Sequence, residues 1–152
     1  MNRLILNYLG SFFILLSILS FFNIIYSYYF NLYLNINTYF YTFLISFIIG
    51  VALFIKNKIE VKINIYTKIF LVIIGYLTIP LIISIPYYFS IYNLSFINSY
   101  FESMSGFTST GFTVFENIKH LDQSLILWRS TSQWIGGIYF LFSILLLIDI
   151  FD

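Results

Sequence analysis

Residues 108–113 are the part of this sequence whose residue types could do chemistry. They form a run of small hydroxyl residues around one glycine. It reads Thr-Ser-Thr-Gly-Phe-Thr. A dehydrated monovalent cation needs several oxygen ligands at once, and backbone carbonyls supply them where the chain turns them toward one axis, a conformation that glycine makes accessible. The run therefore predicts a cation-coordinating loop. Because one strand cannot surround an ion, about four such strands must meet.

Other kinds of functional site are excluded by residue type. The chain has no cysteine and one histidine, so thiol chemistry and a transition-metal site built from Cys or His ligands are excluded within one chain. The sequence has no nucleophile–base pair and no phosphate-binding glycine loop, so we expect neither an enzyme nor a bound cofactor. Its net charge of +1 gives no electrostatic footprint for nucleic acid.

A short helix is predicted directly before the hydroxyl run. Asn98 or Ser99 would cap its start, and Glu102 would complete a capping box with Ser99. The helix would run to about Met104 and end near Gly106. A helix followed by such a loop, between two membrane crossings, is the layout of a re-entrant pore loop. From the pattern alone, an extracellular connection between two helices is the alternative.

The elements around this segment are long and apolar. The chain has 152 residues, of which 61% are hydrophobic and 9% are charged, whereas soluble domains are about 25% charged. A soluble domain is therefore excluded. A bilayer core of about 30 Å needs about 20 apolar residues of helix. Stretches without any charged residue that could supply such helices are residues 4–55, 69–101 and 130–148.

The predicted fold is an all-α integral membrane protein with four transmembrane helices and one re-entrant pore helix with its filter loop. Residues 1–65 would form a two-helix preamble that ends in a basic loop, and residues 66–152 a helix–pore loop–helix repeat. Pro80 and Pro86 fall within or at the end of the third crossing, where packed neighbours can support a kinked helix. The expected crossings are residues 4–26, 39–55, 69–89 and 124–148.

The basic residues predict the orientation of the chain. Four of the seven Lys and Arg residues fall within residues 56–68, and basic loops stay on the cytoplasmic side. We therefore expect a multi-pass protein of the cell (inner or plasma) membrane, surrounded by the lipid bilayer. Both termini would be cytoplasmic, and residues 93–115 would be reached from outside.

Several polar residues of the repeat have two interpretations each. Glu102 could attract cations near the outer mouth, but an acid stabilised by the helix dipole is favoured. Arg129 could line the pore, but a side chain that snorkels to the outer interface is favoured. Gly136 and Gly137 favour close approach of another helix, or a bend, over a gating hinge. The residues expected to be only solvated are Glu116, Lys119, His120 and Asp122.

Two blocks of this sequence resemble a known transporter family. Residues 101–113, FESMSGFTSTGFT, resemble the first pore loop of the Trk/Ktr/HKT potassium-transporter superfamily, especially its TrkH-type subunit. Residues 126–130, ILWRS, and 133–137, QWIGG, resemble the helix that follows that loop. The first two crossings and the basic loop also resemble the N-terminal preamble of TrkH-type proteins. The resemblance implies uptake of potassium, sometimes with sodium, through four such repeats around one pore.

When the family's residue roles are carried over by position, the resemblance implies that Gly111 is the filter glycine of the first repeat. The ligands of K⁺ would be the backbone carbonyls of Thr108, Ser109, Thr110, Gly111 and Phe112. Phe112 departs from the small residue often seen at its position, so its ring is expected to point away from the pore axis. The resemblance also implies a cytoplasmic nucleotide-binding regulatory subunit as a partner, and no cofactor besides the transported ion.

The length of the chain leaves three alternatives open, because one repeat cannot form a selective path. The favoured interpretation is the N-terminal piece of a longer or interrupted Trk-type protein, with the remaining repeats elsewhere. The second is a small cation channel in which four copies of the chain assemble. The third is a membrane adaptor without transport, whose loop is only a connection.

Overall fold

The computed structural model describes residues 3–55 and 65–148, and within these two ranges every regular element is helical. The expected all-α class is confirmed. Most of the predicted basic loop, residues 56–64, lies outside the described residues. The elements are α1 (Arg3–Tyr29), η1 (Tyr33–Asn35), α2 (Ile36–Ile55), α3 (Ile65–Tyr88), α4 (Phe96–Phe107), η2 (Ile118–His120) and α5 (Gln123–Ile148).

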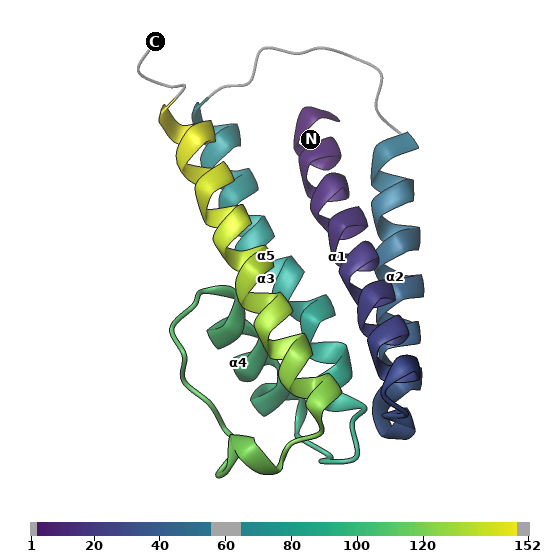
Figure 1. Ribbon diagram of the computed structural model, residues 1–152. Coiled ribbons are helices and arrows are strands. Elements are labelled where there is room, and N and C mark those ends of the chain that lie inside the picture. The colour runs from purple at the N-terminus through teal and green to yellow at the C-terminus, as the bar shows by residue number, and fades with distance from the viewer. Residues whose placement is uncertain (1–2, 56–64, 149–152) are drawn as a thin grey trace.

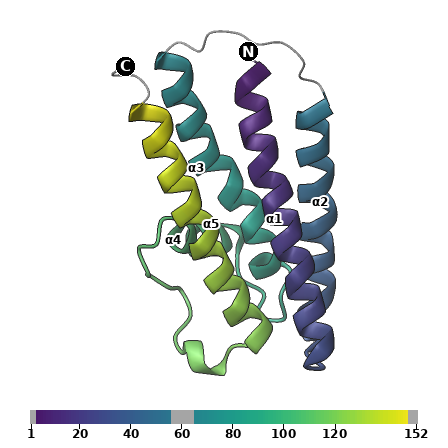
Figure 2. The same cartoon turned by 45° about the horizontal axis from the view of Figure 1, so that its top comes forward.

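The four long helices α1, α2, α3 and α5 form one bundle (Figures 1 and 2). The start of α1, the end of α2, the start of α3 and the end of α5 all lie at the same end of this bundle. The short helix α4 packs against α3 and α5 in the opposite half, together with the loop that follows it. Successive long helices therefore run in alternating directions, as successive membrane crossings must.

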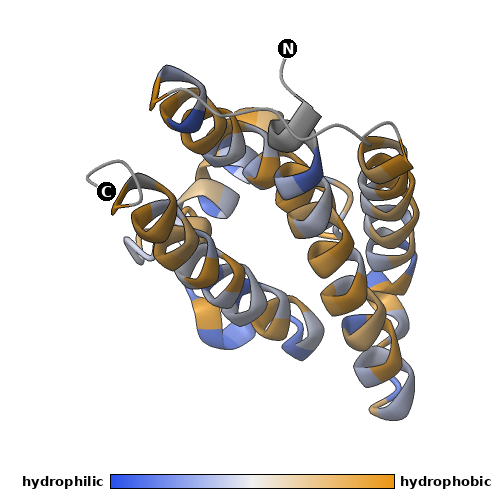
Figure 3. Cartoon of the chain, turned by 90° about the horizontal axis from the view of Figure 1, so that it is seen from above, coloured by the Kyte–Doolittle hydropathy of each residue, from blue (hydrophilic) through white to orange (hydrophobic). Residues whose placement is uncertain are grey.

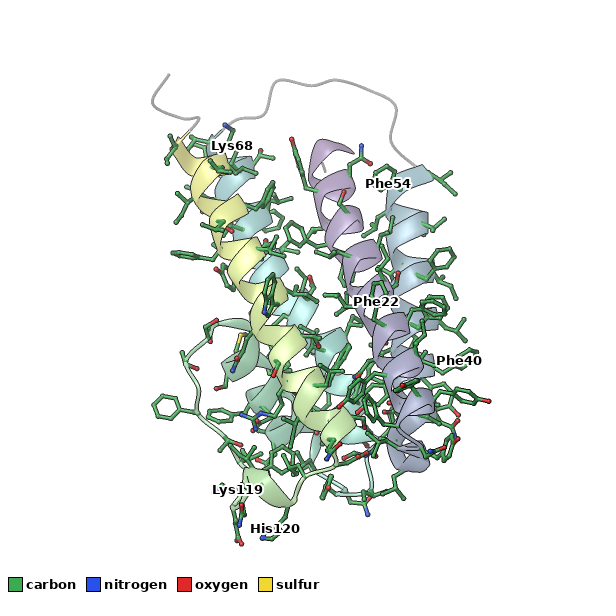
Figure 4. All side chains as sticks on the ribbon, viewed as in Figure 1. Phe22, Phe40, Phe54, Lys68, Lys119 and His120 are labelled. Carbon is green, nitrogen blue, oxygen red and sulfur yellow. The ribbon has the colours of Figure 1, made fainter. Side chains whose placement is uncertain are left out.

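Among the residues that the structure describes, three helical segments have the length and hydropathy needed to cross a membrane. These spans are Asn7–Tyr29, Tyr33–Ile55 and Ile65–Tyr88. Apolar residues predominate along them (Figure 3), and the exposed Phe22, Phe40 and Phe54 are distributed along α1 and α2 (Figure 4). The fourth expected crossing forms the 26-residue α5.

Helix α3 continues through both of its prolines, Pro80 and Pro86. Two neighbouring helices donate hydrogen bonds to carbonyls close to these positions. The Tyr100 hydroxyl of α4 donates to the carbonyl of Leu77 at 3.2 Å. The Trp128 indole N–H of α5 donates to the carbonyl of Ile83 at 3.1 Å. These bonds join α4 and α5 to α3.

A polar network joins η1, α2 and the connection after α3 to the start of α5. Asn35 Nδ2 donates to Asp122 Oδ2 at 2.9 Å, and Ser124 Oγ donates to the same oxygen at 2.8 Å. The Tyr39 hydroxyl lies 3.0 Å from Ser124 Oγ, and the Tyr92 hydroxyl accepts from the backbone N–H of Asp122 at 2.8 Å. The expectation that Asp122 is only solvated is therefore wrong, because its carboxylate connects α5 to the residues before α2.

We expect Asp122→Ala to lower the free energy of unfolding by about 1–3 kcal/mol, because it leaves the buried amide of Asn35 and the hydroxyl of Ser124 without their acceptor. Thermal unfolding in detergent measures this effect. Glu116→Ala removes an exposed acid on the same connection and is the matched control, with an unchanged midpoint. Equal midpoints for the two variants would show that the network adds no stability.

Candidate functional site

Helix α4 begins earlier than the sequence predicts. Ser95 is its N-cap, with an extended backbone, and its hydroxyl oxygen accepts the N–H of Asn98 at 3.3 Å. Ser99 lies inside the helix, where its hydroxyl donates to the carbonyl of Ser95 at 2.9 Å. The predicted capping box of Ser99 and Glu102 is therefore wrong. The physical reason is that Ser95 offers the same capping chemistry four residues before Ser99.

The chain leaves the end of α4 through a tight turn. The Ser109 N–H donates to the carbonyl of Gly106 at 3.0 Å, and the Thr110 N–H donates to the carbonyl of Ser105 at 3.1 Å. Ser109 and Gly111 both have left-handed backbones, with φ of 55° and 80°. A Cβ added to Gly111 would meet no atom within 4 Å, so glycine is required there by the backbone angle and not by lack of space.

The five predicted ligand residues lie together on one exposed turn of the chain. Among the described residues, no hydrogen bond ends on the backbone carbonyls of residues 108–111. The carbonyl of Phe112 accepts a hydrogen bond from the Ser105 hydroxyl at 2.6 Å, and residue Phe112 as a whole is 70% exposed. Four carbonyls are therefore free to bind a ligand, and the fifth is tied to α4. The expectation that the Phe112 ring points away from the pore axis stays a prediction.

A buried ion pair supports this loop from behind. Glu102 of α4 pairs with Arg129 of α5, and their side chains are 1% and 13% exposed. Glu102 Oε2 also accepts the backbone N–H of Val114 at 2.9 Å. The Thr113 hydroxyl donates to both oxygens of Glu102, at 3.1 and 3.0 Å, and accepts from Arg129 Nη1 at 2.9 Å. The strand after the turn is thus bound to two helices.

The favoured interpretations of Glu102 and Arg129 are both wrong. Because α4 begins at Phe96, Glu102 lies in the middle of the helix and does not interact with its N-terminal dipole. Arg129 reaches α4 and the loop, so it does not snorkel to an interface. One signal was present in the sequence: an acid and a base stand alone at the edges of apolar segments, and buried charges are stable only when paired.

A hollow of about 480 Å³ lies beside the first residues of the turn. On one side α5 approaches α4 so closely that a Cβ on Gly136 would overlap the backbone carbonyl of Phe107. The close approach predicted for Gly136 is therefore confirmed, whereas a Cβ on Gly137 would meet nothing within 4 Å. The hollow is lined by Tyr76, Phe107, Thr108, Ser109, Gly136, Gly137 and Phe140.

The fold and the loop define a helical membrane protein with an exposed turn of free backbone carbonyls. Comparison with known families shows which family of membrane proteins the chain belongs to. Residues 35–150 match the TrkH family, described as cation transport protein, and the chain belongs to this family. The match confirms the resemblance seen in residues 101–113 and 126–137. The family is one of transporters and not of enzymes, and together with the apolar helices it indicates a multi-pass membrane protein.

Three curated relatives are similar to parts of the chain. The uncharacterized cation transporter MJ1485 of Methanocaldococcus jannaschii is 46% identical over 55 residues, 36% of this chain and 12% of that protein. The Trk system potassium uptake protein TrkI of Halomonas elongata is 40% identical over 65 residues, 43% of this chain and 13% of that protein. The Trk system potassium uptake protein TrkG of Escherichia coli is 41% identical over 46 residues, 30% and 10% of the two chains.

The matched segments therefore span 10–13% of the length of these relatives. No solved structure matches this chain.

Proposed function

We propose that this chain transports potassium as part of a Trk-type uptake protein, and that residues 108–112 form one strand of its selectivity filter. The observation that carries the proposal is the turn after α4, where residues 108–111 are exposed and their carbonyls accept no hydrogen bond from the described residues. The turn follows the carboxyl end of α4, which carries partial negative charge and favours a cation. Two of the similar proteins are named as potassium uptake proteins.

The proposed position of this segment is re-entrant. Helix α4 has 12 residues, about 18 Å at ~1.5 Å per residue, and cannot cross a hydrocarbon core of about 30 Å. Irregular backbone is stable at membrane depth only where it lines a cavity or is buried in protein. We take α5 as the fourth crossing, where Glu102 neutralises Arg129 and lowers the cost of burying its charge.

We propose that one end of the bundle, where α1 begins and α5 ends, faces the cytoplasm. Lys68 lies at this end, and Lys119 and His120 lie at the other (Figure 4).

The chain has no cysteine, so single cysteines report its topology cleanly. In intact cells, Cys at position 119 should react with a membrane-impermeant maleimide, and Cys at position 58 only after permeabilisation. Labelling of Lys58→Cys from outside would contradict the orientation.

One strand supplies about a quarter of a filter. We propose that the other strands come from further repeats of the same protein, because the relatives are far longer than the segments matched here. Reading the DNA downstream of Asp152 tests this, and we expect three more glycine-centred loops. Unrelated sequence after an intact terminator would favour four copies of this chain around one pore. A cytoplasmic nucleotide-binding regulatory subunit stays a proposed partner.

We call this chain, together with the strands that complete its pore, the complete transporter. In cells that lack potassium uptake, the complete transporter should restore growth at low potassium and take up Rb⁺, a potassium substitute. The membrane adaptor, which has no transport role, predicts neither result. Absence of Rb⁺ uptake by a protein that accumulates in the membrane would contradict the proposed function.

A further inference from the structure

The Thr113 hydroxyl uses its full hydrogen-bonding capacity behind the loop. Its single proton is shared between the two carboxylate oxygens of Glu102, at 3.1 and 3.0 Å. Its oxygen accepts from Arg129 Nη1 at 2.9 Å and from the backbone N–H of Phe115 at 3.1 Å. One hydroxyl therefore connects α4, α5 and the strand that leaves the turn.

These bonds fix the strand on one side of the free carbonyls. Val114 N–H is bound to Glu102 and Phe115 N–H to Thr113, while the carbonyl of Phe112 is bound to Ser105. On the other side, the N–H groups of residues 108–110 are bound to the last turn of α4. The free carbonyls of residues 108–111 thus lie between two anchored segments, and the anchors determine their directions.

The charges of Glu102 and Arg129 also balance one another. Removing one partner of a buried pair leaves an uncompensated charge in a medium of low dielectric constant. Arg129 has one further contact on the loop side, with its guanidinium carbon 6.0 Å from the centre of the Phe115 ring. A guanidinium without Glu102 would place a positive charge behind a loop that has to attract cations.

We propose that Glu102, Arg129 and Thr113 form a positioning clamp that sets the directions of the filter carbonyls and, through them, the preference for potassium over sodium. This inference rests on the proposed function of the loop. None of the three side chains needs to touch the ion. Selectivity depends on the number and arrangement of the coordinating carbonyls, so a looser strand should discriminate less even when it still conducts.

Thr113→Val tests the clamp, because it removes the hydroxyl and keeps nearly the same shape. The measurement is the ratio of Rb⁺ to Na⁺ uptake by the complete transporter, which does not depend on the amount of protein. We expect the ratio to fall about fivefold, the equivalent of one lost hydrogen bond, and Thr113→Ser to restore it. Thr131→Val, which removes a hydroxyl bonded only within α5, is the control with an unchanged ratio.

Charge variants separate positioning from neutralisation. Glu102→Gln should lower the ratio and raise the half-saturating Rb⁺ concentration, because Arg129 is left unneutralised. The neutral double variant Glu102→Gln/Arg129→Gln should recover the Rb⁺ affinity without recovering the ratio. If Thr113→Val and the double variant both keep the parent's ratio of Rb⁺ to Na⁺ uptake, the clamp is overturned. That result would leave the proposed function intact. Absence of Rb⁺ uptake by the parent would instead reject the proposed function.

Discussion

Replacing Gly111 with valine is expected to abolish potassium uptake while the protein still accumulates in the membrane. Gly111 has φ of 80°, where a β-branched residue is a strong outlier. The left-handed conformation costs about 1–2 kcal/mol for a residue with a Cβ, and the chain can relieve this strain by rotating the adjoining peptides. That rotation would turn the carbonyls of residues 110 and 111 away from their present directions.

The fold should survive this change, because a Cβ at position 111 meets no atom within 4 Å. Rb⁺ uptake, normalised to the amount of transporter in the membrane, separates lost transport from lost protein. Gly111→Asn is the matched comparison, since asparagine tolerates left-handed backbone angles better than valine, and it should retain more uptake. Unchanged growth of Gly111→Val at low potassium would remove Gly111 from the filter.

Gly136→Ala is expected to prevent the stable packing of α4 against α5. The added Cβ would overlap the backbone carbonyl of Phe107, and a backbone atom cannot move aside as a flexible side chain can. Overpacking a tight interior costs about 1–3 kcal/mol and occasionally more, which outweighs the gain of about 1 kcal/mol in helix propensity. We expect a lower thermal midpoint in detergent and less protein in the membrane.

Gly137→Ala is the matched control for this prediction. It makes the same chemical change one residue further along α5, at a position where a Cβ meets nothing within 4 Å. Its midpoint should equal or exceed that of the parent. Equal midpoints for the two alanine variants would show that the contact between Gly136 and Phe107 does not hold α4 in place.

The long helices could be predicted from the sequence because membrane crossings depend on local composition. The expected crossings at residues 4–26, 39–55, 69–89 and 124–148 lie within a few residues of the observed limits of α1, α2, α3 and α5. The start of α4 was less well determined, because Ser95, Asn98 and Ser99 all have side chains that can cap a helix.

The contacts that support the loop could not be predicted, because they join residues far apart in the sequence. Glu102 and Arg129 meet only after α4 has folded back between α3 and α5, and the bond of Asn35 to Asp122 spans 87 positions. A polar residue in a connection is usually solvated. Residue type therefore pointed to the loop at residues 108–112 but not to the side chains that hold it, and the role of its carbonyls stays a prediction.

The location of the bound ion tests the central claim most directly. A structure of the complete transporter in Rb⁺, with anomalous scattering to mark the ion, shows which atoms coordinate it. The proposed function predicts an anomalous peak in contact with backbone carbonyls of residues 108–112. Peaks elsewhere in the protein, with none beside this turn, would contradict the assignment of residues 108–112 as a filter strand.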